Sequence, residues 1–199
     1  MERRESFIVG VFIAILVPVC LFFASWWLSI AVVPERYIFI CAFGGLGLGV
    51  LLDAFFLAGW TARAYKFGLP TLAIIYIYVS VITYAVFMGV PVFNLLPGAV
   101  AGLYIGRRLR HDGVTGDAAA RTIRGIGLFA AGVIACAAAS SAFIALRDPY
   151  TGMDIGRMLH MRFSVTRSML VGLIAVGGPA LVACQYWLAA GIARFAYGR

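Results

Sequence analysis

The chain has 199 residues, of which 63% are hydrophobic and 12% are charged, and its formal net charge is +8. Soluble globular domains are about half apolar and about a quarter charged, so this composition excludes that class and indicates a membrane protein. The basic charge could suggest nucleic-acid binding. The arginines, however, stand mostly at the ends of apolar runs, which favours topology signals and lipid headgroup contacts and predicts no nucleic-acid partner.

Apolar runs predict membrane spans, because a spanning helix takes about 20 residues. The first run, 7–33, follows a basic start like that of a signal peptide, but it is longer than the roughly 7–15 residues of a signal core, so we expect an uncleaved span. Further spans are expected at 37–60, 70–90, 92–108, 125–146 and 166–193. No internal repeat or polar linker separates them. The sequence therefore predicts an all-α fold, a polytopic membrane helical bundle forming a single domain over 1–199.

The region 70–106 is the ambiguous one. As one helix it would be about 55 Å long, and the hydrocarbon core is about 30 Å thick, so it must fold back. Either two spans form a tight hairpin, or one span precedes a re-entrant segment at 91–106. Six spans place eleven basic residues inside and five outside, whereas five spans place eight on each side. The positive-inside rule favours six transmembrane helices with both termini cytoplasmic.

Small residues predict where helices approach closely. Gly98, Gly102 and Gly106 repeat every four residues and lie on one face of the fourth span. The fifth span is rich in alanine and serine over 130–142 and offers a partner surface. We expect these two spans to pack within one molecule.

No catalytic or metal-binding constellation is present in the sequence. The histidines, His111 and His160, are expected on opposite sides of the membrane and cannot share a metal. The cysteines form no C-x-x-C pair; they are Cys20, Cys41, Cys136 and Cys184. We therefore predict no enzyme, no cofactor and no metal site.

The third span carries a polar and aromatic stripe, whose members fall on one helix face: Tyr76, Ser80, Thr83, Tyr84 and Phe87. A polar stripe in hydrocarbon should face inward. It is interpreted either as the wall of a ligand pocket or as aromatic packing against glycine.

Other polar groups are expected at a similar depth near the outer surface. Together with the end of the stripe they suggest a vestibule for a ligand, formed by Thr83, Tyr84, Asn94, Ser140, Ser141, Arg147 and Asp148. Pro91 and Pro97 interrupt the backbone around Asn94, as in the broken helices with which transporters present free amides. A simple turn uses the same residues.

The longest outer loop runs over 147–167. Its segment 158–163 is amphipathic and is interpreted as an interfacial stretch or as a lid over the vestibule. Arg157, His160 and Arg162 could attract an anionic ligand.

Asp53 is the one carboxylate well inside an apolar run, which makes it an intramembrane charge with a functional or structural role. Expected partners are Gln185, at similar depth, or an arginine at the inner end, Arg63, Arg107 or Arg124. An ion pair or hydrogen-bond clamp competes with proton or cation coupling.

The stretch 95–106, Leu-Leu-Pro-Gly-Ala-Val-Ala-Gly-Leu-Tyr-Ile-Gly, resembles the fourth helix of some S components, the substrate-binding membrane subunits of energy-coupling-factor vitamin transporters. Gly10 and Ala14 also have the spacing with which the first helix of that family docks on its coupling protein. The resemblance implies six spans, a vitamin or metal ligand near the outer face, and an energising partner.

We therefore expect a small-solute-binding subunit of a transport system, with its ligand near the outer face. The alternative is a non-catalytic structural or assembly subunit of a larger membrane complex, and an intramembrane enzyme acting on lipid is a third, weaker hypothesis. The expected location is the cytoplasmic (inner) membrane of a prokaryote, as a multi-pass protein. The expected partners are the lipid bilayer, a small-molecule ligand and other membrane subunits.

Overall fold

The computed structural model describes residues 3–158, 160 and 165–198. Over these residues every regular element is helical and no strand is present, which confirms the predicted all-α class. Five stretches are long and apolar enough to cross a membrane; they are Gly10–Val32, Glu35–Lys66, Leu69–Val86, Gly116–Arg147 and Arg167–Gly198. The chain is thus a multi-pass membrane protein by the length and composition of its helices.

The helices follow the predicted spans with shifted ends. They are α1 (Arg3–Val32), α2 (Glu35–Arg63), α3 (Leu69–Val86), α4 (Leu95–His111), α5 (Gly116–Arg147), α6 (Thr151–Met158) and α7 (Arg167–Gly198), with short 3-10 turns η1 (Ala64–Lys66) and η2 (Pro91–Asn94). The helix α5 begins nine residues before the predicted span, in a basic stretch that extends past the apolar core. The helix α4 has 17 residues and a basic last turn, so it falls outside the five stretches above.

The chain forms two compact units, Met1–Ile75 and Tyr76–Arg199, with the boundary inside α3. Each unit has its own helix packing and is described separately. The expectation of a single domain stays a prediction.

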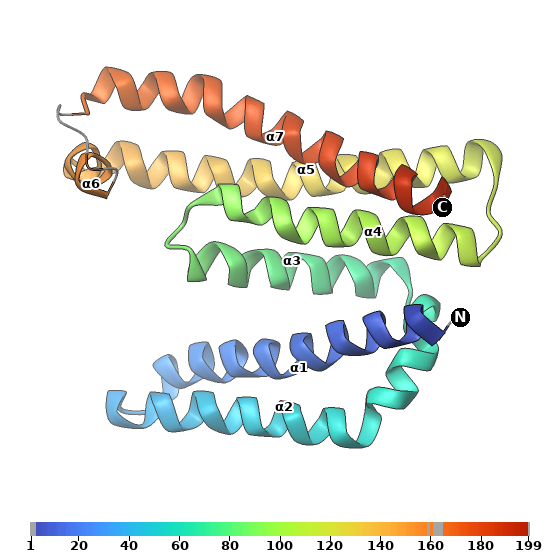
Figure 1. The fold of residues 1–199 in the computed structure, drawn as a ribbon. Coiled ribbons are helices and arrows are strands. Elements are labelled where there is room, and N and C mark those ends of the chain that lie inside the picture. The colour runs from blue at the N-terminus through green and yellow to red at the C-terminus, as the bar shows by residue number, and fades with distance from the viewer. Residues whose placement is uncertain (1–2, 159, 161–164, 199) are drawn as a thin grey trace. The chain divides into compact units, whose positions relative to one another are not determined.

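In the first unit, α1 and α2 form an antiparallel hairpin (Figure 1). Two glycines on one face of α2 bring the backbones together. Gly45 lies against Leu21 and Ser25, and Gly49 lies against Pro18, so a β-carbon at either position would collide with α1. Close packing between these helices therefore depends on glycine, as is usual where lipid supplies no hydrophobic drive.

In the second unit, α4 and α7 make the closest contact. Gly102 abuts the carbonyl of Ala189, Gly106 abuts that of Ala193, and Gly98 abuts the side chain of Gln185. The helix α5 packs on α7 as well, and more lightly on α4. The glycine face thus packs inside the chain, as expected, but the predicted partner was wrong.

The partner of this face is α7 and not the fifth span, because α7 offers residues at matching four-residue spacing, with fully buried Ala189 and Ala193. Many of the small residues on α5 instead lie beside α7 around an open apolar groove. An alanine-rich composition identifies a helix that can be approached closely, but it does not say which neighbour does so.

The helix α4 runs from one end of the second unit to the other. At its start, the turn before it is bonded to Ser141, near the end of α5. At its far end, the hydroxyl of Tyr197 near the end of α7 donates to the carbonyl of Val114, just beyond α4, with an O···O distance of 2.9 Å. The segment 95–111 therefore crosses the second unit as one helix and does not fold back within its own length (Figure 1).

Candidate functional site

Most of the residues expected to form one ligand site lie in three places of the second unit. Some form a buried polar layer, some tie the α3–α4 turn to α5, and some line a pocket at the α5–α6–α7 end. Each place has a different chemical character, and they are taken here from the deepest outward.

The buried layer joins α3, α7 and the turn η2, which leads into α4. The Nε2 amide of Gln185 donates to the hydroxyl of Tyr76 at 3.2 Å, and the Nδ2 amide of Asn94 donates to the carbonyl of Ser80 at 3.1 Å. The exposed fractions are 0% for Gln185, 2% for Asn94 and 2% for Ser80. Two neutral amides thus link α3 to α7 and to the turn before α4, in a region where water is excluded, and such bonds hold the elements together.

The layer is polar but packed. Ser80 Oγ, Asn94 Oδ1 and Gln185 Oε1 are buried and have no hydrogen-bond partner among the described residues. The Gln185 side chain fills the space beside Gly98, and the ring of Tyr76 lies 5.4 Å from that of Phe129, centroid to centroid. Tyr76 and Ser80 line neither of the two pockets described below.

One turn along α3 from Ser80, Tyr84 starts a hydroxyl relay. Its hydroxyl lies 3.0 Å from Ser141 Oγ, which lies 2.6 Å from the carbonyl of Gly89. Ser141 Oγ also lies 3.0 Å from the carbonyl of Ala137, and the shorter distance to Gly89 indicates that Ser141 donates chiefly to Gly89 and accepts from Tyr84. Gly89 has a φ of +77°, a conformation that glycine adopts without strain, and it packs on the Tyr84 ring.

The neighbouring hydroxyls are not part of this relay. Thr83 donates to the carbonyl of Val79 at 2.9 Å, and Ser140 donates to that of Cys136 at 2.9 Å, each within its own helix. Ser140 is exposed on the outside of α5. Serine and threonine commonly satisfy themselves in this way in helices.

Replacing Ser141 by alanine is expected to loosen the α3–α4 turn. The Tyr84 hydroxyl and the Gly89 carbonyl each lose a partner, and the cost is about 1–2 kcal/mol of unfolding free energy. Hydrogen exchange of the amides over 87–94 measures the effect. Ser140→Ala is the matched control and should leave exchange unchanged; equal effects of the two variants would contradict the relay.

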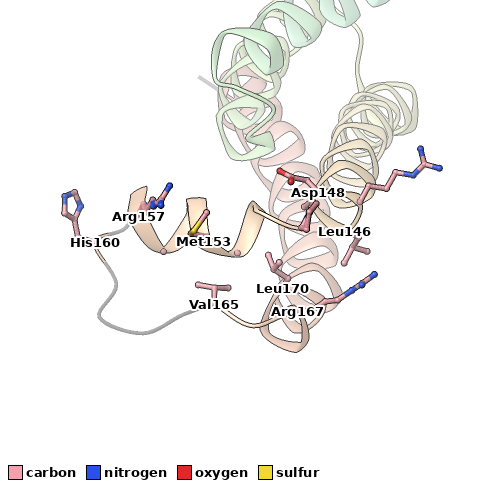
Figure 2. Close-up of a pocket in the computed structure, with 13 residues that line it drawn as sticks. Leu146, Asp148, Met153, Arg157, His160, Val165, Arg167 and Leu170 are labelled. Atoms are coloured by element: carbon pink, nitrogen blue, oxygen red, sulfur yellow. The ribbon is translucent and has the colours of Figure 1, made fainter.

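The pocket lies at the end where α5 stops and α7 starts, with α6 extending from it (Figure 2). Its volume is about 750 Å³. Gly152 on α6 is buried against the carbonyl of Val165, which holds the short helix against the segment before α7. Leu146, Met153 and Leu170 supply apolar lining.

Asp148 has a structural role at the start of α6. Its carboxylate accepts from the amide of Tyr150 at 2.9 Å and from the hydroxyl of Thr151 at 3.3 Å. A carboxylate before a helix satisfies free amides and favours that helix end. Asp148 therefore lines the pocket while fixing where α6 begins.

The charged lining of the pocket is mostly positive. The charged or titratable side chains are Arg147, Arg157, His160 and Arg167 together with Asp148. The guanidinium of Arg147 lies 4.6 Å from the Phe143 ring centroid. His160 and Arg167 lie at opposite ends of the pocket, so the cations do not converge on one point (Figure 2). The guanidinium of Arg157 lies 4.0 Å from the carboxylate of Asp154 on the same helix.

The expected lid falls partly outside the described residues. The structure describes α6 and His160, but Leu159 and residues 161–164, including Arg162, lie outside it. Arg167, at the start of α7, joins the pocket although the sequence did not single it out as a ligand residue.

A second hollow, of about 580 Å³, runs between α5 and α7. Its lining is apolar and mostly small, with Ala135, Ala138 and Gly178 beside Trp187. Its polar side-chain groups are the hydroxyl of Tyr186 and the indole N–H of Trp187, and it contains no charged residue among the described lining.

The expected partners of Asp53 are divided between the two units. Within the second unit, Gln185 donates to Tyr76 and belongs to the buried layer. Within the first unit, both carboxylate oxygens of Asp53 are buried and have no hydrogen-bond partner among the described residues, so the expected pairing with Arg63 is absent there. A pairing of Asp53 with Gln185, Arg107 or Arg124 stays a prediction.

Comparison with known proteins finds no matching family model, no similar curated protein and no similar solved structure.

Proposed function

We propose that this chain is a small-solute-binding subunit of a membrane transport system and that it holds an anionic solute in the α5–α6–α7 pocket. The observation that carries the proposal is the pocket itself. Its volume of about 750 Å³ suits a small molecule, since ligand sites commonly measure about 300–1,000 Å³. Three arginines and one carboxylate line it, and although Asp154 lies 4.0 Å from Arg157, the cations still outnumber the carboxylates, which makes the site attractive to anions.

The proposed topology has six crossings with both termini in the cytoplasm of a prokaryote. The course of α4 from one end of the second unit to the other supports a full crossing at 95–111 over a re-entrant loop. At about 1.5 Å per residue, its 17 residues extend about 26 Å, close to the thickness of the hydrocarbon core. The basic end of α4 then faces inward and the pocket faces outward.

The packing beneath the pocket supports a binding role. Ser141 is six residues before Arg147, about 9 Å along α5, so the hydroxyl relay braces the helices just below the pocket. The mouth is formed by a short helix anchored at Asp148 and Gly152. A binding site mounted on rigid helices with a small capping element holds its ligand with little reorganisation.

Transport would require a partner that supplies energy, as in the S components that the stretch 95–106 resembles. Those proteins bind a vitamin or metal. An anionic solute is the class that the arginines here favour.

Native mass spectrometry of the protein, extracted gently from its own membrane, tests the proposal. We expect a retained small anion in the wild type and a loss of at least tenfold in its occupancy in Arg167→Gln. Arg121→Gln is the control, because Arg121 is an exposed cation on α5 outside the pocket. It should keep the ligand.

The second candidate is a structural or assembly subunit of a larger membrane complex. The packed state of Tyr76 and Ser80 and the apolar α5–α7 groove favour it, because a helix could dock there. In the same experiment, stoichiometric protein partners without a small molecule would support this candidate and refute the binding subunit.

A further inference from the structure

The hairpin of α1 and α2 contains a buried acid that no described group of the first unit satisfies. Asp53 is 8% exposed, and neither of its carboxylate oxygens has a hydrogen-bond partner among the described residues. Its position on α2 continues the face that includes Gly45 and Gly49, one turn further on, and those glycines lie against α1. An ionised carboxylate in this setting is costly, because hydrocarbon solvates no charge.

The opposing helix has a gap in its backbone hydrogen bonding. Pro18 lies inside α1 and has no N–H, so it cannot donate to the carbonyl of Ala14, four residues earlier. In a membrane that carbonyl also lacks water. It is an acceptor in need of a donor.

The register of the hairpin places these two groups at the same level. Gly49 lies against Pro18, and the helices are antiparallel. Because the helices run in opposite directions, the next turn of α2, which carries Asp53, lies beside the preceding turn of α1, which carries Ala14. The contacts of Gly45 with Ser25 on one side, and of Thr61 with Gly10 on the other, keep this register along the hairpin.

We propose that Asp53 and the Ala14 carbonyl form a proton-binding site: the Asp53 carboxyl holds a proton and donates it in a hydrogen bond to that carbonyl. One proton then serves both groups. The Asp53 hydroxyl gains an acceptor, and the carbonyl gains the donor that Pro18 withholds. Without the proton, carboxylate and carbonyl oxygens would face each other as two acceptors.

The charges around the site favour the protonated form. The stretch Gly10–Val32 of α1 contains no acidic, basic or histidine residue, and its one thiol, Cys20, lies six residues from Ala14 on a different face. On α2 the other charged residues are Glu35, Arg36 and Arg63, near its two ends. Arg63 is ten residues from Asp53, about 15 Å along the helix. The site is in the first unit and is independent of the pocket proposed for the solute.

Infrared difference spectroscopy of the full chain in phosphatidylcholine–phosphatidylglycerol vesicles tests this site. We expect a carbonyl band of a protonated carboxylic acid at neutral pH that shifts in heavy water and is lost in Asp53→Asn. The asparagine amide can donate to the same carbonyl, so this variant should keep the fold.

A proline replacement tests the acceptor. Pro18→Ala supplies an amide N–H to the Ala14 carbonyl, so the Asp53 carboxyl loses its acceptor and its band should shift to higher wavenumber. Pro179→Ala is the matched control, because Pro179 is also inside a helix, in the second unit. That replacement should leave the band in place. Pro18→Gly restores the same amide without a side chain and serves if Pro18→Ala does not fold.

The absence of the carboxylic acid band in the wild type at neutral pH would overturn the proton site. A band that Pro18→Ala and Pro18→Gly leave unmoved would overturn the role of the Ala14 carbonyl. Neither result bears on retention of a solute, so this site and the solute pocket stand or fall separately.

Discussion

Replacing Gly102 by leucine is expected to lower the free energy of unfolding by about 3 kcal/mol, through forced separation of α4 and α7. Gly102 lies directly against the carbonyl of Ala189, and backbone cannot move aside as a flexible side chain can. In the membrane the lost contact is not replaced by a hydrophobic drive, because lipid is as apolar as the helix surface. Reversible unfolding in mixed detergent micelles, followed by helical circular dichroism, measures the loss.

Gly132→Leu provides the control for this substitution. Gly132 is in the middle of α5, is exposed, and has no atom within 4 Å of the position that a β-carbon would take. We expect a change of less than about 0.5 kcal/mol, as for surface substitutions generally. Equal losses in the two variants would mean that the glycine face does not set the α4–α7 distance.

The second large effect is expected from Gln185. Replacement by alanine removes the bond to the Tyr76 hydroxyl and leaves a cavity beside Gly98, at a cost of about 2–4 kcal/mol. Gly98→Ala alone is also expected to destabilise, by about 1–2 kcal/mol, because its methyl group would occupy the place of the Gln185 amide.

Combining the two substitutions should reverse the sign of the stability change that Gly98→Ala causes. In a Gln185→Ala background the new methyl group enters the vacated space, so Gly98→Ala should stabilise the chain by about 1 kcal/mol. The same unfolding assay measures all four chains of the cycle. Simple additivity of the two losses would contradict the packing of Gln185 against Gly98.

These experiments address the part of the molecule on which the proposed binding site rests. The α4–α7 contact and the buried amide layer hold the second unit together, and the Tyr84–Ser141–Gly89 relay closes it beneath the pocket. If the solute enters the pocket beside α6, then this short helix, anchored at Asp148 and Gly152, is the element whose position changes on binding. Variants of the layer should therefore change stability more than they change solute retention.

The sequence alone determined the class of the protein and much of its helix layout. Apolar runs of spanning length are readable without a fold, because each span must satisfy its own backbone and face lipid. The four-residue spacing of Gly98, Gly102 and Gly106 likewise identified a close-packed face. Both properties are local to one helix.

Tertiary structure decided which groups meet. The glycine face pairs with α7 because Ala189 and Ala193 match its spacing, while the more alanine-rich α5 borders an open groove. The expected ligand residues separate for a similar reason: Tyr76 bonds to Gln185 on α7, Tyr84 bonds to Ser141 on α5, and Arg147 lies against Phe143 of its own helix. The bond between Gln185 and Tyr76 was not foreseen, because depth along a span is visible in the sequence, whereas the rotation of one helix against another is set only when their side chains pack.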